Sequence, residues 1–138
     1  MRQAQHRLLQ TTRGKGLVEI TPAVARWVGE QRMSTGLLTM FCRHTSASLL
    51  IQENADPTVR SDLETYFERL APDGDLYSHD LEGPDDMPAH LKTALTQTSL
   101  SVPVGNGRLL LGTWQGLYLF EHRVQSHERQ IVLHLVGA

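Results

Sequence analysis

Histidine and carboxylate side chains in the middle of this 138-residue chain have the types and spacing that metal or acid–base chemistry requires. His79 and His90 enclose a segment that contains Asp86, and His44 follows Arg43 at the end of an apolar run. Neutral imidazole together with carboxylate is the usual ligand set for zinc and other divalent transition metals. If the loop and the strand end converge, these residues would form a metal site or a catalytic histidine cluster.

The same spacing leaves a structural interpretation open. No Cys-x-x-Cys or His-Glu-x-x-His pattern fixes a metal site in this chain, and many histidines in loops are simply solvated. Asp86 and His90 are four residues apart, so they would share a face only if both lay within one helix. Glu121, which precedes His122 in another predicted strand, is a second carboxylate that could orient a histidine.

Anion binding is a second chemistry that this region supports. We expect a short helix from Pro88, and the free backbone N–H groups at its start would attract a phosphate group. His90, with Arg43 or Arg123 nearby, could then bind the phosphate oxygens. The alternative is that Asp86 or its neighbour caps this helix, and the sequence does not choose between the two.

Nucleophilic catalysis has weaker support. Ser46 and Ser48 lie close to His44, but no Gly-x-Ser-x-Gly elbow surrounds them, and Cys42 belongs to an apolar run typical of a buried strand. Trp114 stands among glycines at a predicted break between strands, where it would line a pocket or pack in the core. We therefore expect no serine or cysteine nucleophile.

The order of the predicted elements decides which of these side chains can meet. Two strands, a helix and two further strands are followed by two helices and then by four strands. The predicted strands cover residues 3–12, 17–20, 37–42, 48–51, 100–104, 108–111, 117–122 and 130–136. This order predicts a single α+β domain over residues 1–138 with a largely antiparallel sheet.

Three helices are expected from their start signals and apolar stripes. Thr21 and Asp56 precede prolines and are typical N-caps for the first two helices. A loop rich in Pro, Gly and Asp covers residues 71–88, and its length favours a functional role. The third helix would begin at Pro88. Its inner face is expected to consist of Leu91, Ala94 and Leu95.

Composition narrows the class of protein. With 13 Lys and Arg against 15 Asp and Glu, the net charge of −2 gives no basic surface for nucleic acid. A single cysteine allows no internal disulfide, and no apolar run reaches the ~20 residues that span a bilayer. The N-terminal segment lacks the apolar region of a secretion signal. We therefore expect a cytoplasmic protein without a nucleic-acid or membrane partner.

Several multi-residue segments in a fixed order resemble the signature of the YjbQ family, and together they cover nearly the whole chain. The segments are Arg43–Ser48, Glu53–Arg60, Tyr77–Asp80, Pro84–His90, Gly112–Gly116 and Glu121–Arg129. The resemblance implies a compact α+β fold in which a mixed sheet curls into a half-barrel with about three helices. It also implies a homotrimer.

The activity that the resemblance implies is that of a secondary thiamine-phosphate synthase. This reaction joins hydroxymethylpyrimidine diphosphate to hydroxyethylthiazole phosphate and releases pyrophosphate, so the small-molecule partner would be phosphorylated. A diphosphate leaving group needs positive charge, which a divalent metal (zinc or magnesium) or cationic side chains would supply. Two alternatives stay open: a metal-dependent hydrolase of a small phosphorylated metabolite, and a phosphometabolite-binding protein without catalytic activity.

The polar positions of the family signature carry over onto this sequence and, combined with the spacing above, give the expected site. The catalytic residues would be His44, His79, Asp86, His90 and Glu121. Substrate would be bound by Arg43, Asn54, Asp56, Trp114 and Gln115. The metal ligands would be His44, His79 and His90, and Glu53 is a further polar position of the signature.

Overall fold

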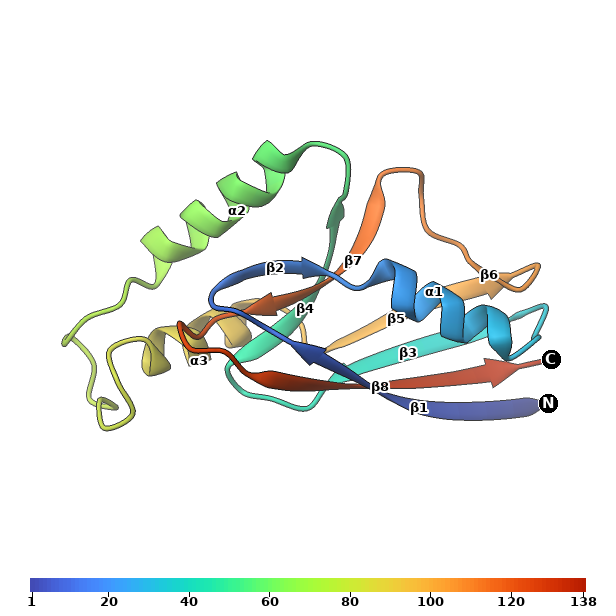
Figure 1. Ribbon diagram of the computed structural model, residues 1–138, viewed down its shortest axis with the longest axis horizontal. Coiled ribbons are helices and arrows are strands. Elements are labelled where there is room, and N and C mark those ends of the chain that lie inside the picture. Colours follow the sequence, from blue (N-terminus) through green and yellow to red (C-terminus); the bar gives the residue numbers. More distant parts are fainter.

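All 138 residues are described by the computed structural model, whose eight strands and three helices follow the order that the sequence predicts. The strands are β1 (Arg2–Thr11), β2 (Gly16–Glu19), β3 (Gly36–Cys42), β4 (Ala47–Glu53), β5 (Ser99–Gly105), β6 (Arg108–Leu109), β7 (Gln115–Glu121) and β8 (Glu128–Gly137). The helices are α1 (Thr21–Glu30), α2 (Pro57–Leu70) and α3 (Asp86–Leu95). Because β1 pairs with β8, the two termini lie side by side (Figure 1).

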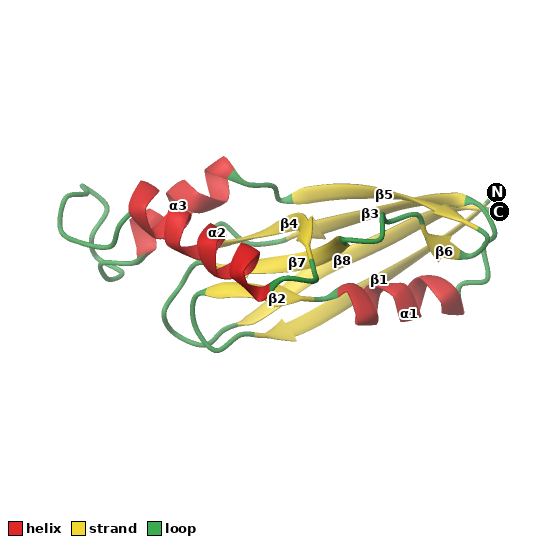
Figure 2. Cartoon of the chain, turned by 90° about the horizontal axis from the view of Figure 1, so that it is seen from above, coloured by secondary structure: helices red, strands yellow, loops and turns green.

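The strands form two sheets that curl into a half-barrel (Figures 1 and 2). The larger sheet has the order β1-β8-β3-β5-β6, and the smaller has the order β2-β7-β4. Every strand pair is antiparallel. The predicted α+β class and the half-barrel with three helices are therefore confirmed, while the sheet contains no parallel pair that would make it mixed.

One apolar core lies between the two sheets. Along β8 every second residue points inward, so Ile131, Leu133 and Leu135 are buried while Val132 and the other alternating residues face outward. Residues of β3, β4, β5 and β7 complete the core by the same alternation. Since both sheets contribute to one core, the chain folds as a unit, and the outer face of the larger sheet stays open.

Helix α1 packs against the core through Val24 and Val28, which are four residues apart and both buried. The predicted cap at Thr21 is wrong, because the helix begins at Thr21 and Ile20 occupies the cap position. The Thr21 hydroxyl instead donates to Glu19 Oε2 and accepts from the backbone N–H of Leu117. It therefore joins the helix to the smaller sheet.

Helix α2 begins as predicted. The side chain of Asp56 accepts a hydrogen bond from Thr58 N at 2.9 Å, and Pro57 occupies the first helical position. No residue of α2 is buried, and the helix packs on the smaller sheet mainly through Leu63 and Phe67. It therefore stands out from the body of the protein over β2 and β7 (Figure 1).

Helix α3 begins at Asp86, two residues before the predicted start. Pro88 fits the first turn, where backbone N–H groups have no partner within the helix. The expected inner face of Leu91, Ala94 and Leu95 is wrong, since Leu95 is 60% exposed. The buried residues are Asp86, Pro88, Ala89 and Lys92. The helix presents two charged side chains to the interior because each has a partner of opposite charge there.

Helices α2 and α3, with the loop between them, lie at the end of the molecule away from the two termini (Figure 2). None of the three helices combines the length and the apolar composition that a membrane crossing requires.

Candidate functional site

His79, Asp86 and His90 converge at the start of α3. His79 Nε2 lies 2.6 Å from Asp86 Oδ2, and His90 Nε2 lies 3.2 Å from the same oxygen. One nitrogen or oxygen atom from each of the three residues lies within 4.8 Å of the others, which is close enough for all three to bind one metal ion. Because α3 begins at Asp86, Asp86 and His90 are one helical turn apart on the same face.

Arg123 holds the Asp86 carboxylate in place. Its Nη1 donates to Asp86 Oδ1 at 2.7 Å, and its Nε donates to Asp85 Oδ2 at 3.1 Å. A further donor, Nη2, binds the carbonyl oxygen of Glu82, so the guanidinium joins the loop to the start of the helix. Asp85 also accepts from Val124 N at 2.9 Å. This arrangement leaves Asp86 Oδ2 to the two histidines.

The environment of these carboxylates favours their charged forms. Burial alone would raise the pKa of Asp86, but the hydrogen bond from His79 and the charges of His90 and Arg123 outweigh burial and lower the pKa. Burial would likewise raise the pKa of Asp85, but the hydrogen bonds from Val124 N and Arg123 and the charge of Arg123 outweigh it and lower the pKa. Both side chains are therefore ionised at neutral pH.

The hydrogen bonding of His90 makes its second nitrogen available as a ligand. Its Nδ1 lies 2.8 Å from the carbonyl oxygen of Thr45, which only accepts, so Nδ1 carries a proton. In a neutral ring Nε2 then has a lone pair that faces Asp86 Oδ2, and two acceptors meet at 3.2 Å. A cation between them, either a proton or a metal ion, removes this repulsion. Two imidazoles and one carboxylate fit zinc better than magnesium, which prefers oxygen ligands.

His44 lies outside this group. Its Nε2 accepts a hydrogen bond from Gln130 N at 2.8 Å, so that nitrogen is engaged by β8. Burial and the nearby charge of Arg129 lower the pKa of His44, which is therefore neutral at pH 7. The adjacent Arg43 donates to the side chain of Gln130 at 3.1 Å. The third residue of the metal group is Asp86 rather than His44.

Glu121 forms part of a buried ion pair. Its carboxylate accepts from Arg129 Nε at 2.8 Å and from the Thr12 hydroxyl at 2.6 Å, and it also contacts Arg129 Nη2. Burial would raise the pKa of Glu121, but the hydrogen bonds from Arg129 and Thr12 lower it. Its histidine contacts are the backbone N–H of His122 at 3.1 Å and the side chain of His127 at 3.9 Å, so Glu121 orients none of the three site histidines.

The other expected substrate-binding residues lie at the opposite end of β7. Asn54 N donates to the carbonyl oxygen of Trp114, and Gln115 Oε1 accepts from Gly112 N at 2.8 Å. Trp114 is 63% exposed, so it is no core tryptophan. Asp56 caps α2 beside them. Since β7 spans seven residues, about 20 Å, the two groups do not meet within one chain.

The structure adds groups to the site that sequence reasoning did not place there. Arg123 is expected from the sequence only as a phosphate ligand, and the Thr45 carbonyl has no sequence signal at all.

Lys92 is buried against Glu68, beside a cavity that His122 also lines. The only signal for Lys92 is a lysine within a short apolar helix, which is also typical of a solvent-exposed position.

The two antiparallel sheets, the three helices and the His–Asp–His group define the class: a small α+β protein with a candidate metal centre at the loop–helix junction. The family described as UPF0047 protein YjbQ-like matches residues 5–138. A UPF0047 protein of Synechocystis is 51% identical over 137 residues, which covers 99% of this chain and 93% of that protein. The YjbQ protein of Escherichia coli O157:H7 is 43% identical, with 96% and 97% covered.

Solved structures agree with these relationships. A conserved hypothetical protein from Thermus thermophilus has a TM-score of 0.81 at 37% identity and covers 95% of this chain and 99% of its own. A YbjQ-like protein of unknown function from Sulfolobus solfataricus has a TM-score of 0.87 at 23% identity, covering 99% and 100%, and so supports the fold alone. The chain belongs to the UPF0047, or YjbQ-like, family.

Proposed function

We propose that His79, Asp86 and His90 bind a divalent metal ion, and that the chain acts there on a small phosphorylated molecule. The observation behind this proposal is that both imidazole Nε2 atoms lie within 3.2 Å of one Asp86 oxygen while Arg123 fixes the other. Zinc is the ion that suits this donor set best. The specific reaction we propose is thiamine-phosphate synthesis, on the basis of the family signature in the sequence.

Each residue has a separate task in this proposal. Asp86 and the two histidines hold the metal, and the bound ion would stabilise negative charge on a leaving diphosphate. Arg123 keeps Asp86 ionised and aimed at the histidines. Thr45 fixes the His90 ring so that Nε2 faces the ligand group. In the reaction the bond from the pyrimidine methylene carbon to the diphosphate oxygen breaks, the bond to the thiazole nitrogen forms, and pyrophosphate leaves.

A metal-dependent hydrolase is the second candidate, and the exposure of the group favours it. The side chain of His79 is 46% exposed, so water can reach the ligand group from the loop side. A metal with three protein ligands and an open position is the usual arrangement for activating water. Under this candidate the product would be inorganic phosphate and an alcohol instead of a joined pyrimidine and thiazole.

The test measures metal content and turnover in the same preparations. Chelator-treated protein is reloaded with zinc, and release of pyrophosphate and of phosphate is followed with both thiamine precursors and with simple phosphate esters. We expect the His79→Ala and Asp86→Asn variants to bind less than one zinc ion per chain. Their turnover rate should fall at least tenfold. His6→Ala is the matched control, because His6 is an exposed histidine of β1 whose ring stacks on Trp27 of α1, away from the metal group.

The products and the variants then separate the candidates. Pyrophosphate released only when both precursors are present supports the synthase, and phosphate released from esters supports the hydrolase. Stoichiometric ligand binding without either product would support a phosphometabolite-binding protein. Unchanged zinc content in both site variants would contradict the assignment of the metal group itself.

We also propose a homotrimer, and the divided site supports it. Asn54, Trp114 and Gln115 lie at the far end of β7 from the metal group, so they could reach its substrate only from another copy. Association of copies would therefore complete the site. The expected cytoplasmic setting stays a prediction.

A further inference from the structure

A cavity of about 180 Å³ lies beneath α2, apart from the metal group. Its apolar walls are Phe67 and Phe120, whose rings meet edge to face at 5.3 Å. Its polar lining includes Lys92 and His122, which are both almost completely buried. A cavity of roughly 150 Å³ is enough to accept benzene, so this one has room for a molecule with a single ring.

Lys92 brings a buried positive charge to the cavity with few hydrogen-bond partners. Its side chain is 2% exposed, and Nζ donates to one acceptor, the Glu68 carboxylate. An ammonium group has three donors, so two of them have no acceptor from the protein. Buried donors of this kind normally find a partner. The cavity therefore offers unused positive hydrogen-bond donors.

His122 lines the cavity as a neutral, buried imidazole. Its Nε2 lies 2.9 Å from Ser48 Oγ, which in turn lies 2.6 Å from the Thr96 hydroxyl. The ring is neutral, because burial and the charge of Lys92 lower the pKa of His122 to about 3. Nδ1 has no hydrogen-bond partner in the protein, so the ring adds no second charge and Lys92 is the main donor in the cavity.

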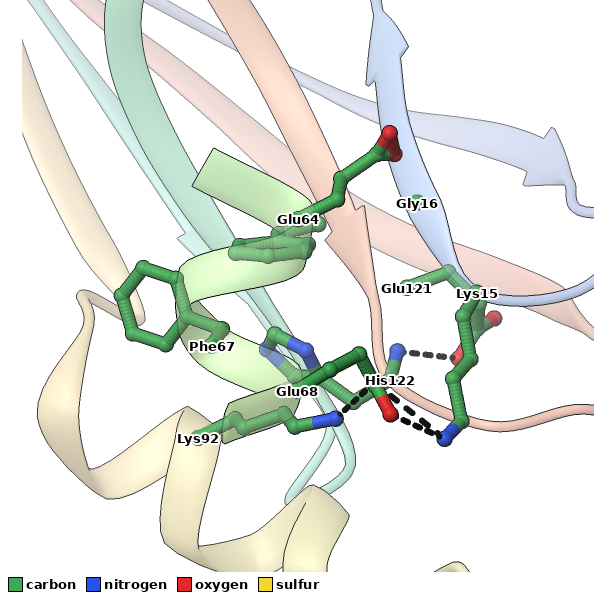
Figure 3. Close-up of a pocket in the computed structure, with 9 residues that line it drawn as sticks. Lys15, Gly16, Glu64, Phe67, Glu68, Lys92, Glu121 and His122 are labelled. Carbon is green, nitrogen blue, oxygen red and sulfur yellow. Dashed lines mark hydrogen bonds and ion pairs between the residues drawn. The ribbon is translucent and has the colours of Figure 1, made fainter. Parts of the chain in front are cut away.

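Glu68 is a replaceable acceptor for Lys92. Its side chain is half exposed and belongs to α2, a helix without a single buried residue. Lys15 also donates to both Glu68 oxygens, at 3.1 and 3.2 Å, and Figure 3 shows Lys15 and Lys92 reaching Glu68 from opposite sides. If another carboxylate took its place at Lys92, Glu68 would keep Lys15 as its cation.

We propose that this cavity binds a small organic carboxylate with an apolar body. The ligand carboxylate replaces Glu68 as the acceptor for Lys92, while the apolar body lies against Phe67 and Phe120 beside the His122 ring. The carboxylates of Glu64, Glu68 and Glu121 in the lining disfavour a doubly charged phosphate. This site is separate from the proposed metal centre and does not depend on its function.

Benzoate is the probe for the test, with benzamide as its neutral analogue and inorganic phosphate as the alternative anion. The full chain is labelled with ¹⁵N and titrated by NMR. We expect saturable shifts at Phe67, Lys92 and His122 with benzoate, at least tenfold weaker binding of benzamide, and no saturable shifts at these residues with phosphate. Arg69→Met, an exposed position in the last turn of α2, is the matched control and should bind benzoate as the unmodified chain does.

Two variants with opposite expected effects decide the outcome. Lys92→Met should weaken benzoate binding at least tenfold, because the main charged donor is lost. Glu68→Gln should strengthen binding several-fold, because it removes the internal competitor, and loss of folding cannot imitate a gain in affinity. The proposal is overturned if benzoate causes no saturable shifts in the cavity, if phosphate binds as well as benzoate, or if Glu68→Gln binds more weakly.

Discussion

Asp86 is the residue on which the geometry of the candidate metal centre depends. It is buried, and it has contacts with two histidines on one oxygen and with Arg123 on the other. Without such partners, the free-energy cost of desolvating a buried carboxylate would far exceed the stabilisation that the N-terminal end of a helix gives to a negative charge. The contacts that stabilise the charge of the carboxylate also fix its orientation toward the two histidines. The structural role of Asp86 and its proposed functional role therefore depend on the same contacts.

His122 is the opposite case, a buried imidazole that is stable only when neutral. Its ring packs against Phe120 with the centroids 4.4 Å apart, and Ser48 is its one side-chain hydrogen-bond partner. Burial first, and then the charges of Lys92 and Arg129, lower its pKa from 6.5 to about 3. Protonating His122 in the folded state therefore costs more than protonating it in the unfolded chain.

The low pKa of His122 predicts a loss of stability in mild acid. Between pH 6.5 and 3 the unfolded chain binds a proton at this residue that the folded chain does not, so the free energy of unfolding falls as the pH falls. From pH 7 to pH 4.5 the contribution is roughly 2–3 kcal/mol. Urea denaturation of chelator-treated protein at the two pH values measures it, and His122→Gln should reduce the loss by that amount.

His6→Gln serves as the comparison for this measurement, since it changes an exposed histidine of β1. The explanation fails if His122→Gln shows the same dependence on pH as His6→Gln and the unmodified chain.

At the scale of the elements, α2 is the least firmly attached part of the fold. Arg60, Glu64 and Glu68 follow one another at four-residue intervals and contact Tyr118, Leu17 N and the two lysines from one face. Polar contacts of this kind exchange with water more readily than a packed apolar face does. The helix can therefore open locally while the sheets stay folded.

Hydrogen exchange under native conditions tests this view of α2. Backbone amides of α2 should exchange through local openings, whereas amides of β7 and β8 should exchange only by global unfolding. Asp56→Ala removes the acceptor for Thr58 N and should speed exchange in the first turns of α2. Asp62→Ala, an exposed position in the same helix, should not. Equal protection in α2 and in β8 would contradict the prediction.

At the scale of the whole molecule, the outer face of the larger sheet has exposed apolar side chains among its polar ones. Phe41 is 48% exposed and lies opposite Val132, and Leu37 lies opposite Val136 on the same face. Exposed apolar side chains that gather on one face commonly mark an interface between proteins. This face is where we expect the copies of the proposed homotrimer to meet.

Sedimentation equilibrium measures the assembly directly. The chain should sediment at about three times its mass of 15.5 kDa, and Phe41→Glu should lower the mass towards that of a single chain because it buries a charge in the interface. Arg13→Glu, an exposed position between β1 and β2, is the comparison and should leave the assembly intact. A species of 15.5 kDa for the unmodified chain at micromolar concentration would refute the trimer.

The features that depend on neighbours along the chain are visible in the sequence. The alternation in β8, the Asp56 cap before Pro57 and the order of eight strands and three helices all follow from local patterns. Several segments together indicated the family, and one of them, Pro84 to His90, contains two residues of the metal group, Asp86, which was expected to be catalytic, and His90, which was expected to bind metal. These predictions succeed because the physical causes, side-chain period and backbone capping, act over a few residues.

What the sequence alone determined was the α+β architecture, the family and the residues around the long loop. Only the tertiary structure decided that Asp86 takes the position expected for His44, that Arg123 holds it from 37 residues away, and that Lys92 faces inward where leucines were expected. The physical reason is that a charge can be buried only where a partner of opposite charge meets it. Those partners, Arg123 for Asp86 and Glu68 for Lys92, come from distant segments that only the folded chain brings together.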